Sequence, residues 1–237
     1  MPLGLPDSIR ACLFDLDGVL TDTASIHEAA WKAMFDEVLA QKHLSPSFSQ
    51  QDYNDFVDGK PRDAGTSGFL DSRKISASPD EVAAMGKRKN ELFLLRLHTD
   101  GVTVYPGSLA YLEAVRAAGL RTAVVSSSTN CKEVCDAAKI SQYLDVRVDG
   151  VTAKAEKLAG KPAPDTFLDA ANELGLAAAE CAVFEDALAG VEAGRAGRFG
   201  FVVGVDRVHH AAALKAHGAT RVVTDLQQLL ECEEDGT

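Results

Sequence analysis

From Val102 onward, short apolar runs alternate with segments whose apolar residues recur at helical spacing. Runs typical of buried strands lie at 122–125, 146–148, 182–184, 201–203 and 221–223, and an earlier one at 11–14. Helical segments lie at 107–118, 130–138, 163–174, 188–193, 208–216 and 226–230. Repeated βα units predict an α/β fold, with a parallel sheet covered by helices on both faces.

Between Asp22 and Gly101 the strand-like runs disappear. Helical patterns replace them at 25–39, 51–56, 62–70 and 79–97. A helical block directly after the first strand is typical of an inserted cap domain. We therefore expect an α/β core domain made of residues 1–23 and 102–237, and an α-helical cap domain of residues 24–101. The hinges would lie near residues 22–25 and 100–103.

The composition describes an ordinary globular protein, with 46% hydrophobic and 25% charged residues. A formal net charge of -11 disfavours a nucleic-acid or anionic membrane surface. The N-terminus has no basic, apolar leader, no apolar run reaches membrane-spanning length, and the five cysteines show no zinc spacing. We expect a cytoplasmic monomer with reduced thiols, and local Lys and Arg side chains wherever it binds an anion.

Two carboxylates, Asp15 and Asp17, follow the first strand and precede Gly18. Residues two apart along a strand point the same way, so both can address one substrate atom. Two bare carboxylates that close repel each other, and a Mg²⁺ ion would offset the repulsion and bind phosphate oxygens. The pattern indicates phosphoryl transfer, with Asp15 as nucleophile and Asp17 as proton shuttle. Taken alone, it also fits a solvated turn bent at Gly18.

The string Asp-Leu-Asp-Gly-Val-Leu-Thr-Asp at 15–22 resembles the first motif of the haloacid dehalogenase-like (HAD) phosphotransferases. Later motifs of that superfamily follow in order: Ser126 after a strand, Lys161 in Lys-Pro-Ala-Pro-Asp, and Glu185-Asp186 after another strand. The resemblance implies a Rossmannoid parallel-sheet core with an α-helical cap. It also implies that Ser126 hydrogen-bonds the transferring phosphoryl group and that Lys161 bridges it to the nucleophile.

The same resemblance implies a Mg²⁺ site formed by Asp15, the main-chain carbonyl of Asp17, Asp186 and Glu185. Each later motif has a plainer alternative by itself. A serine there can cap the next helix, a lysine before a proline turn can be a surface residue, and acids often begin helices.

Within the superfamily, the segment 21–32 is similar to the first hinge and cap helix of the β-phosphoglucomutase family. There, the residue matching His27 links hinge closure to Asp17, and the one matching Thr23 supports Asp17. Trp31 matches the tryptophan position of that helix and fits the cap core better than a platform for the substrate. A helical histidine, too, is often only a packing residue.

Other positions of the sequence match residues that contact the substrate in this family. Gly59 and Arg62 resemble a Gly-x-x-Arg loop that holds the non-reacting phosphate, and Lys89 matches a cap lysine that contacts the sugar phosphate. A solvated basic helix face is the alternative at 87–89. Ser128 and Asn130 match a loop that often reads Ser-x-Ser-Lys-Asn, but Thr129 stands at its lysine position. One contact to the sugar phosphate is therefore missing or supplied otherwise.

These features predict a Mg²⁺-dependent enzyme that interconverts β-D-glucose 1-phosphate and glucose 6-phosphate through an aspartyl phosphate and a bisphosphorylated sugar. A sugar-phosphate phosphatase uses the same residues and remains the first alternative. A catalytically silent binding protein with an acidic Mg²⁺ pocket is a third. The sequence leaves open the exact sugar and anomer, the oligomeric state and the effect of Thr129.

Overall fold

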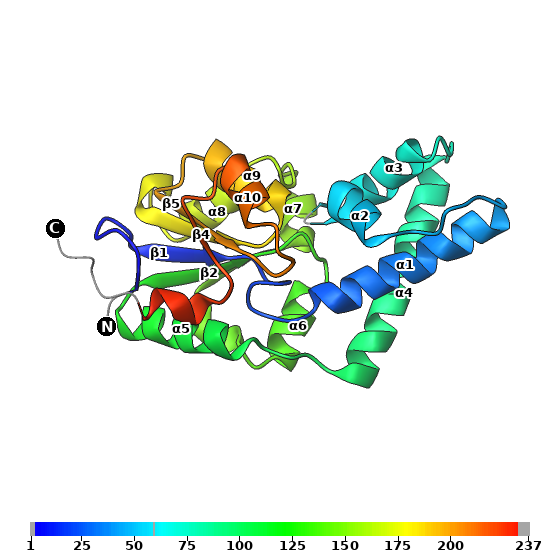
Figure 1. Ribbon diagram of the computed structural model, residues 1–237. Coiled ribbons are helices and arrows are strands. Elements are labelled where there is room, and N and C mark those ends of the chain that lie inside the picture. Colours follow the sequence, from blue (N-terminus) through cyan, green and yellow to red (C-terminus); the bar gives the residue numbers. More distant parts are fainter. Residues whose placement is uncertain (1–2, 59, 232–237) are drawn as a thin grey trace.

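The computed structural model describes residues 3–58 and 60–231 and is built on one parallel sheet (Figure 1). Its six strands run in the order β3-β2-β1-β4-β5-β6. They are β1 (Ala11–Phe14), β2 (Arg121–Val125), β3 (Val146–Val148), β4 (Cys181–Glu185), β5 (Phe201–Val205) and β6 (Arg221–Val223). All pairings are parallel, which confirms the predicted α/β fold class.

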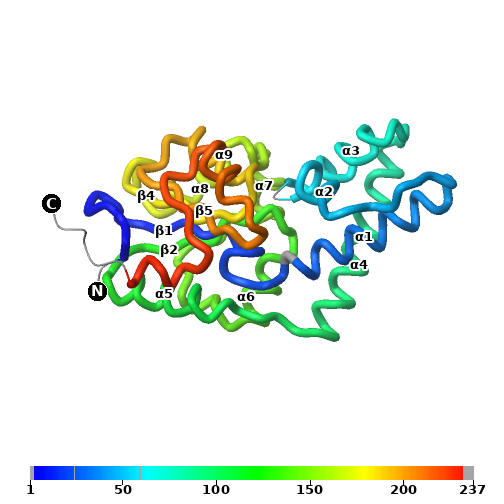
Figure 2. Tube along the Cα trace, in the orientation of Figure 1, coloured from blue at the N-terminus to red at the C-terminus, as the bar shows by residue number. Residues whose placement is uncertain are grey.

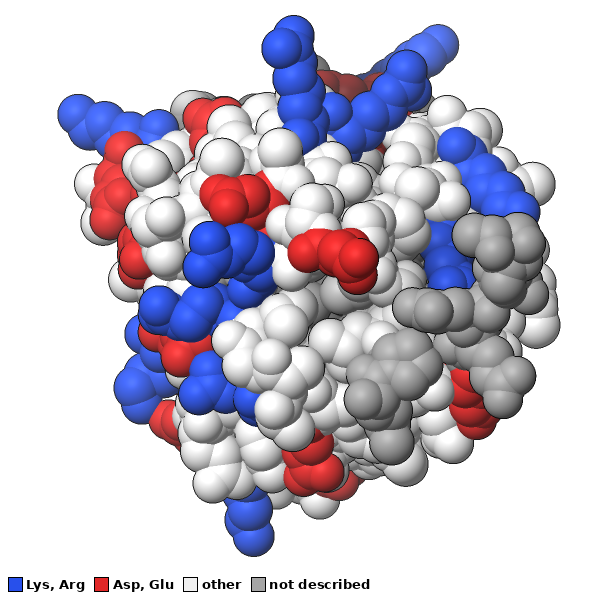
Figure 3. Space-filling model, turned by 90° about the vertical axis from the view of Figure 1, so that its left-hand side faces the viewer, with Lys and Arg blue, Asp and Glu red and all other residues white. Residues whose placement is uncertain are grey.

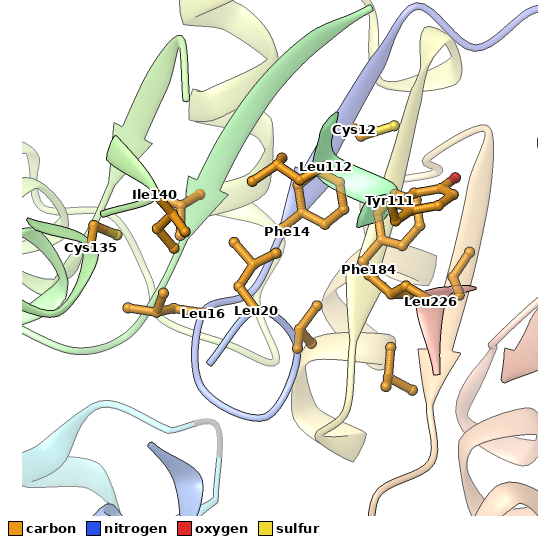
Figure 4. Packing of buried hydrophobic residues seen from close by; sticks show 14 of the residues in the cluster. Cys12, Phe14, Leu16, Leu20, Tyr111, Leu112, Cys135, Ile140, Phe184 and Leu226 are labelled. Atoms are coloured by element: carbon orange, nitrogen blue, oxygen red, sulfur yellow. The ribbon is translucent and has the colours of Figure 1, made fainter. Parts of the chain in front are cut away.

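Strand β1 lies in the centre of the sheet and is buried on both faces. Successive side chains of a strand point to opposite faces. Cys12 and Phe14 accordingly join one hydrophobic cluster, and Ala11 and Leu13 join the other. Figure 4 shows Phe14 packed near Phe184 in the first cluster, where the two rings stack with centroids 4.5 Å apart. This double burial fixes the point at which the chain leaves the sheet.

Helices cover both faces of the sheet. One face packs against α5 (Pro106–Ala117), α6 (Cys131–Ala137) and the 3-10 turn η4 (Leu226–Leu229). The other packs against α8 (Asp165–Glu173), α9 (Leu188–Ala196) and α10 (Ala211–His217). Short 3-10 turns, η2 (Ser141–Tyr143) and η3 (Ala178–Glu180), precede β3 and β4. The alternation of strands and helices agrees with the sequence pattern, apart from element ends.

Two departures from that pattern matter. Helix α10 begins at Ala211, whereas a start at 208 was predicted. Helix α7 (Gly150–Glu156) was not predicted at all. It begins because the Asp149 carboxylate accepts hydrogen bonds from the main-chain N–H groups of Val151 and Thr152, at 2.9 and 3.1 Å.

Residues 24–100 form a separate helical layer beyond the carboxyl ends of the strands (Figure 1). It contains α1 (Ala24–Gln41), α2 (Gln50–Asp52), the π-helix η1 (Tyr53–Val57), α3 (Arg62–Ser72) and α4 (Pro79–Asp100). Its own apolar cluster centres on Phe35, which contacts the rings of Trp31, Phe48 and Phe69. A separate core is what an independently packed cap needs, and the division into two domains stays our proposal.

Two connections join the helical layer to the sheet, and Figure 2 lets both be traced along the chain. They run side by side, because Thr21 and Val104 form an antiparallel bridge. The N–H of Asp22 also donates to the carbonyl of Thr103 at 2.8 Å. Both connections therefore run past the loop that follows β1, one from that loop to α1 and the other from α4 to α5.

The charges are spread over the surface in both signs. Figure 3 shows the end of the molecule that faces away from the helical layer, where basic and acidic side chains occur beside one another. Among the described helices, none combines the length and apolar character required to cross a bilayer.

Candidate active site

The first predicted residues lie in the loop that follows β1. The strand ends at Phe14, and the N–H of Asp15 still donates to the Phe184 carbonyl at 2.9 Å. Gly18 then turns the chain with a φ of 84°. A Cβ at this glycine would overlap the Asp186 carboxylate, so only glycine allows the loop to approach β4 so closely. Asp15 and Asp17 consequently line the same cavity, although they lie past the strand rather than within it.

Lys161 joins two acidic residues from different strands. Its ammonium lies 2.5 Å from Oδ1 of Asp15 and 2.6 Å from Oε1 of Glu185, and it also donates to the Val125 carbonyl at 3.0 Å. All three charged side chains are nearly fully buried. Burial opposes the charged lysine, but the two carboxylates outweigh it and raise the pKa of Lys161. The ammonium is therefore fixed beside Asp15.

The site holds more negative charge than Lys161 can offset. Burial raises the pKa of Asp15 well above its usual value, with Glu185 and Asp17 adding to the effect. Burial, with Asp58 next in importance, likewise raises the pKa of Asp186. Oxygen atoms of Asp15, Glu185 and Asp186 all lie within 4.8 Å of one another. A buried carboxylate set with excess negative charge fits a hard divalent cation such as Mg²⁺.

Asp17 is held by Thr23, just before α1, and by His27 within α1. Oγ1 of Thr23 donates a short hydrogen bond to Oδ1 of Asp17, and Nε2 of His27 lies 3.4 Å from the same oxygen. Burial alone would raise the pKa of Asp17, but His27 and Thr23 outweigh it and lower the pKa to about 2. On the sheet side, Oγ of Ser126 reaches Oδ2 of Asp17 at 3.5 Å. Asp17 is thus an oriented, ionised carboxylate in this arrangement.

Lys89 contacts His27 on the side of the imidazole ring that faces away from Asp17. Its Nζ lies 2.5 Å from Nδ1 of His27 and 5.2 Å from the ring centroid of Trp31. Burial, together with the nearby Arg62 guanidinium, lowers the pKa of Lys89 to about 7. Trp31 is buried in the helical core yet also lines the cavity, so both of its expected roles fit.

Arg62 bridges the two layers. Its Nη2 donates to Oδ1 of Asn90 at 2.8 Å and to Oγ1 of Thr129 at 2.9 Å. The amide of Asn130 donates to the same Asn90 oxygen at 2.8 Å. Asn90 is a contact that the sequence reasoning missed, although it directly follows Lys89 in the segment already singled out. The loop at 128–130 and the helical layer are thereby joined at the cavity.

The cavity between the layers has a volume of about 440 Å³. Eight predicted residues line it directly: Asp15, Asp17, His27, Trp31, Arg62, Lys89, Ser128 and Asp186. Three further predicted residues contact side chains that line the cavity. Thr23 and Ser126 contact Asp17, and Lys161 contacts Asp15. The predicted residue Gly59 lies outside the described residues. The hydroxyl of Ser128 also accepts from the N–H of Asn130 at 3.2 Å, so it supports the loop as well.

Comparisons with known proteins agree with this geometry. The model of the haloacid dehalogenase-like hydrolase family matches residues 9–198. β-Phosphoglucomutases of Mycobacterium tuberculosis and Mycobacterium bovis are each 52% identical over 246 residues, covering 96% of this chain and 94% of theirs. The crystal structure of a Clostridium difficile β-phosphoglucomutase superposes with a TM-score of 0.79 at 29% identity, covering 93% of both chains.

The extent of these matches excludes a likeness confined to one motif. They cover the parallel sheet and the inserted helices together, and the relatives span the same length of chain. The catalytically silent alternative therefore loses its support, and the protein is an enzyme. The chain belongs to the β-phosphoglucomutase family of the haloacid dehalogenase-like superfamily.

Proposed function

We propose that this protein is a Mg²⁺-dependent β-phosphoglucomutase that interconverts β-D-glucose 1-phosphate and glucose 6-phosphate. The observation that carries the proposal is the pair Asp15 and Asp17, which line one cavity with different partners. Asp15 contacts an ammonium, whereas Asp17 contacts a histidine and a hydroxyl. Two carboxylates in different environments can take different chemical roles.

Asp15 acts as the nucleophile. One of its oxygens forms a bond to phosphorus while the bond between phosphorus and the sugar oxygen breaks, which leaves an aspartyl phosphate. Lys161 and Ser126 stabilise the charge on the transferring group. Bound Mg²⁺, held by Asp15, Asp186, Glu185 and the Asp17 carbonyl, would offset the charge between the carboxylates and the phosphoryl oxygens.

Asp17 moves the proton. It protonates the leaving sugar oxygen when Asp15 accepts the phosphoryl group, and it removes the proton from the attacking hydroxyl when the group returns. Thr23, just before the helical layer, and His27, within it, orient Asp17, so a productive Asp17 depends on the closed arrangement. The 6-hydroxyl of an incoming β-glucose 1-phosphate accepts the group from phosphorylated Asp15 and forms a bisphosphate. The bisphosphate then transfers its 1-phosphate to Asp15 and leaves as glucose 6-phosphate.

The non-reacting phosphate needs a site of its own. Arg62, Ser128 and Asn130 would bind it where the layers meet, while Lys89 and Trp31 line the wall around the sugar phosphate. Charge-assisted hydrogen bonds from arginine suit phosphate well. We further propose a cytoplasmic monomer that binds this small substrate and no nucleic acid or membrane.

A sugar-phosphate phosphatase is the second candidate, because water can replace the sugar hydroxyl at the aspartyl phosphate. Similarity to hexitol phosphatase A of Escherichia coli favours this candidate. The two chains are 34% identical over 188 residues, which cover 79% of each chain. The neutral Thr129 beside Arg62 also weakens the case for a tightly held second phosphate.

One assay separates the candidates. Purified protein is incubated with Mg²⁺ and β-glucose 1-phosphate, and glucose 6-phosphate is measured against free inorganic phosphate. The mutase proposal expects glucose 6-phosphate in large excess. Inorganic phosphate as the main product would establish a phosphatase, and absence of metal-dependent turnover would reject both.

A further inference from the structure

Helix α7, which the sequence pattern did not reveal, packs directly on the loop at 127–129. An ideal Cβ placed on Gly150 would lie 2.7 Å from the Ser127 carbonyl oxygen and 3.0 Å from the Thr129 main-chain nitrogen. No side chain fits between them, so the first turn of α7 is in backbone contact with this loop. The Asp149 carboxylate anchors that turn, and Arg147 in turn contacts Asp149 at 2.9 Å.

Lys154 lies on the same face of α7 as Gly150. Residues four apart on a helix are neighbours on one face, so the contact of Gly150 with the loop places Lys154 beside it. The side chain of Lys154 is exposed and lines the cavity together with Thr129 and Arg62. Arg62 enters from the helical layer and Lys154 from the sheet layer.

Lys154 is also distinguished by its lack of a partner. Lys161 contacts Asp15 and Glu185, Lys89 contacts His27, and Lys60 donates to the Asp55 carbonyl. Lys154 makes no ion pair or hydrogen bond with any residue in the described part of the chain. A cation at the cavity wall with no internal partner is available to an anion that enters.

We propose that Lys154 is a phosphate-binding residue of the sheet layer, which contacts the non-reacting phosphate of a bisphosphorylated sugar from the side opposite Arg62. The inference rests on the proposed function and names a residue of its second phosphate site. Thr129 offers only a neutral hydroxyl there, and it already accepts a hydrogen bond from Arg62. Lys154 supplies the positive charge that this wall otherwise lacks, so the phosphate joins both layers.

Binding can be tested without turnover. In an Asp15→Asn background, calorimetry gives the Kd of glucose 1,6-bisphosphate for variants at position 154. Lys154→Arg should stay within about twofold, Lys154→Met should weaken binding about tenfold, and Lys154→Glu should weaken it further. Lys215→Met, at an exposed position of α10, is the matched control and should leave the Kd unchanged.

A second measurement separates this role from a structural one. With Asp15 intact, hydrolysis of acetyl phosphate reports on the reaction site, and Lys154→Met should lower its kcat/KM far less than it weakens bisphosphate binding. An unchanged Kd for the bisphosphate in Lys154→Met and Lys154→Glu would overturn the proposal. So would an equal effect of Lys215→Met, or an equal loss with acetyl phosphate. Because the calorimetric result needs no isomerisation, it holds even if the wild-type protein forms no glucose 6-phosphate.

Discussion

The guanidinium of Arg207 lies 3.7 Å from the ring centroid of Tyr105 and stacks over it. Arg207 also donates from Nε to the Gly18 carbonyl at 2.7 Å. Tyr105 donates its hydroxyl to Oδ1 of Asp22 at 3.0 Å. The pair thereby ties together the loop after β1 and both connections to the helical layer, which carry Asp22 and Tyr105.

Loss of this pair should destabilise the fold. Arg207→Met removes the donor to the Gly18 carbonyl and the cation–π contact, which should lower the free energy of unfolding by about 2 kcal/mol. Urea denaturation measures the change. Arg195→Met, at an exposed position of α9, is the control. A loss no larger than in that variant would show that Arg207 does not hold the loop.

Asp15 should be indispensable. Asp15→Asn keeps the shape of the side chain but removes the nucleophile, so mutase and phosphatase turnover should both fall below detection, together with any acid-stable label from a phosphoryl donor. Product formation and labelling with radioactive phosphate provide the measurements. Appreciable residual turnover would exclude the aspartyl-phosphate mechanism.

Asp186 should govern the metal requirement. Asp186→Ala removes an anionic oxygen from the buried carboxylate set, so the Mg²⁺ concentration for half-maximal rate should rise by about tenfold or more, and kcat should fall. A Mg²⁺ titration of initial rate measures both. Asp136→Ala, at an exposed position of α6, should behave as wild type. An unaltered titration in the Asp186 variant would place the metal elsewhere.

Arg62 should matter only for substrates with a second phosphate. A charge-assisted hydrogen bond of about 1.5–3 kcal/mol corresponds to about a ten- to hundredfold loss of mutase kcat/KM in Arg62→Ala. Hydrolysis of acetyl phosphate should change far less. Arg88→Ala, an exposed arginine of the same helical layer, is the control. Equal losses on both substrates would assign Arg62 to structure or to the reaction site.

Lys89 should make stability depend on pH. Its pKa in the fold is about 7, below the usual 10.5, so at pH values below 7 the full cost of burying the ammonium is present. Between these values the folded lysine loses its proton, and stability rises with pH. Lys89→Met should therefore raise Tm by about 4 °C or more near pH 6, and by less near pH 9.5. Thermal unfolding without phosphate tests this, and a pH-independent difference would contradict it.

Local patterns in the sequence determined much of this protein. The apolar run at 11–14 predicts a strand buried on both faces, because parallel strands under two layers of helices have no polar side. Asp15 and Asp17 follow it, and the change from strand to helix periodicity marks the inserted layer. These features depend on residues a few positions apart, so they can be read without knowing the fold.

The tertiary structure decided which distant residues meet. Asn90 contacts Arg62 and Asn130, Thr129 accepts from Arg62, and Lys154 lines the same cavity. No local pattern predicts these contacts, because they depend on how the helical layer closes on the sheet. Even α7 was missed, since its short helix depends on one carboxylate cap and on packing against a loop from another strand.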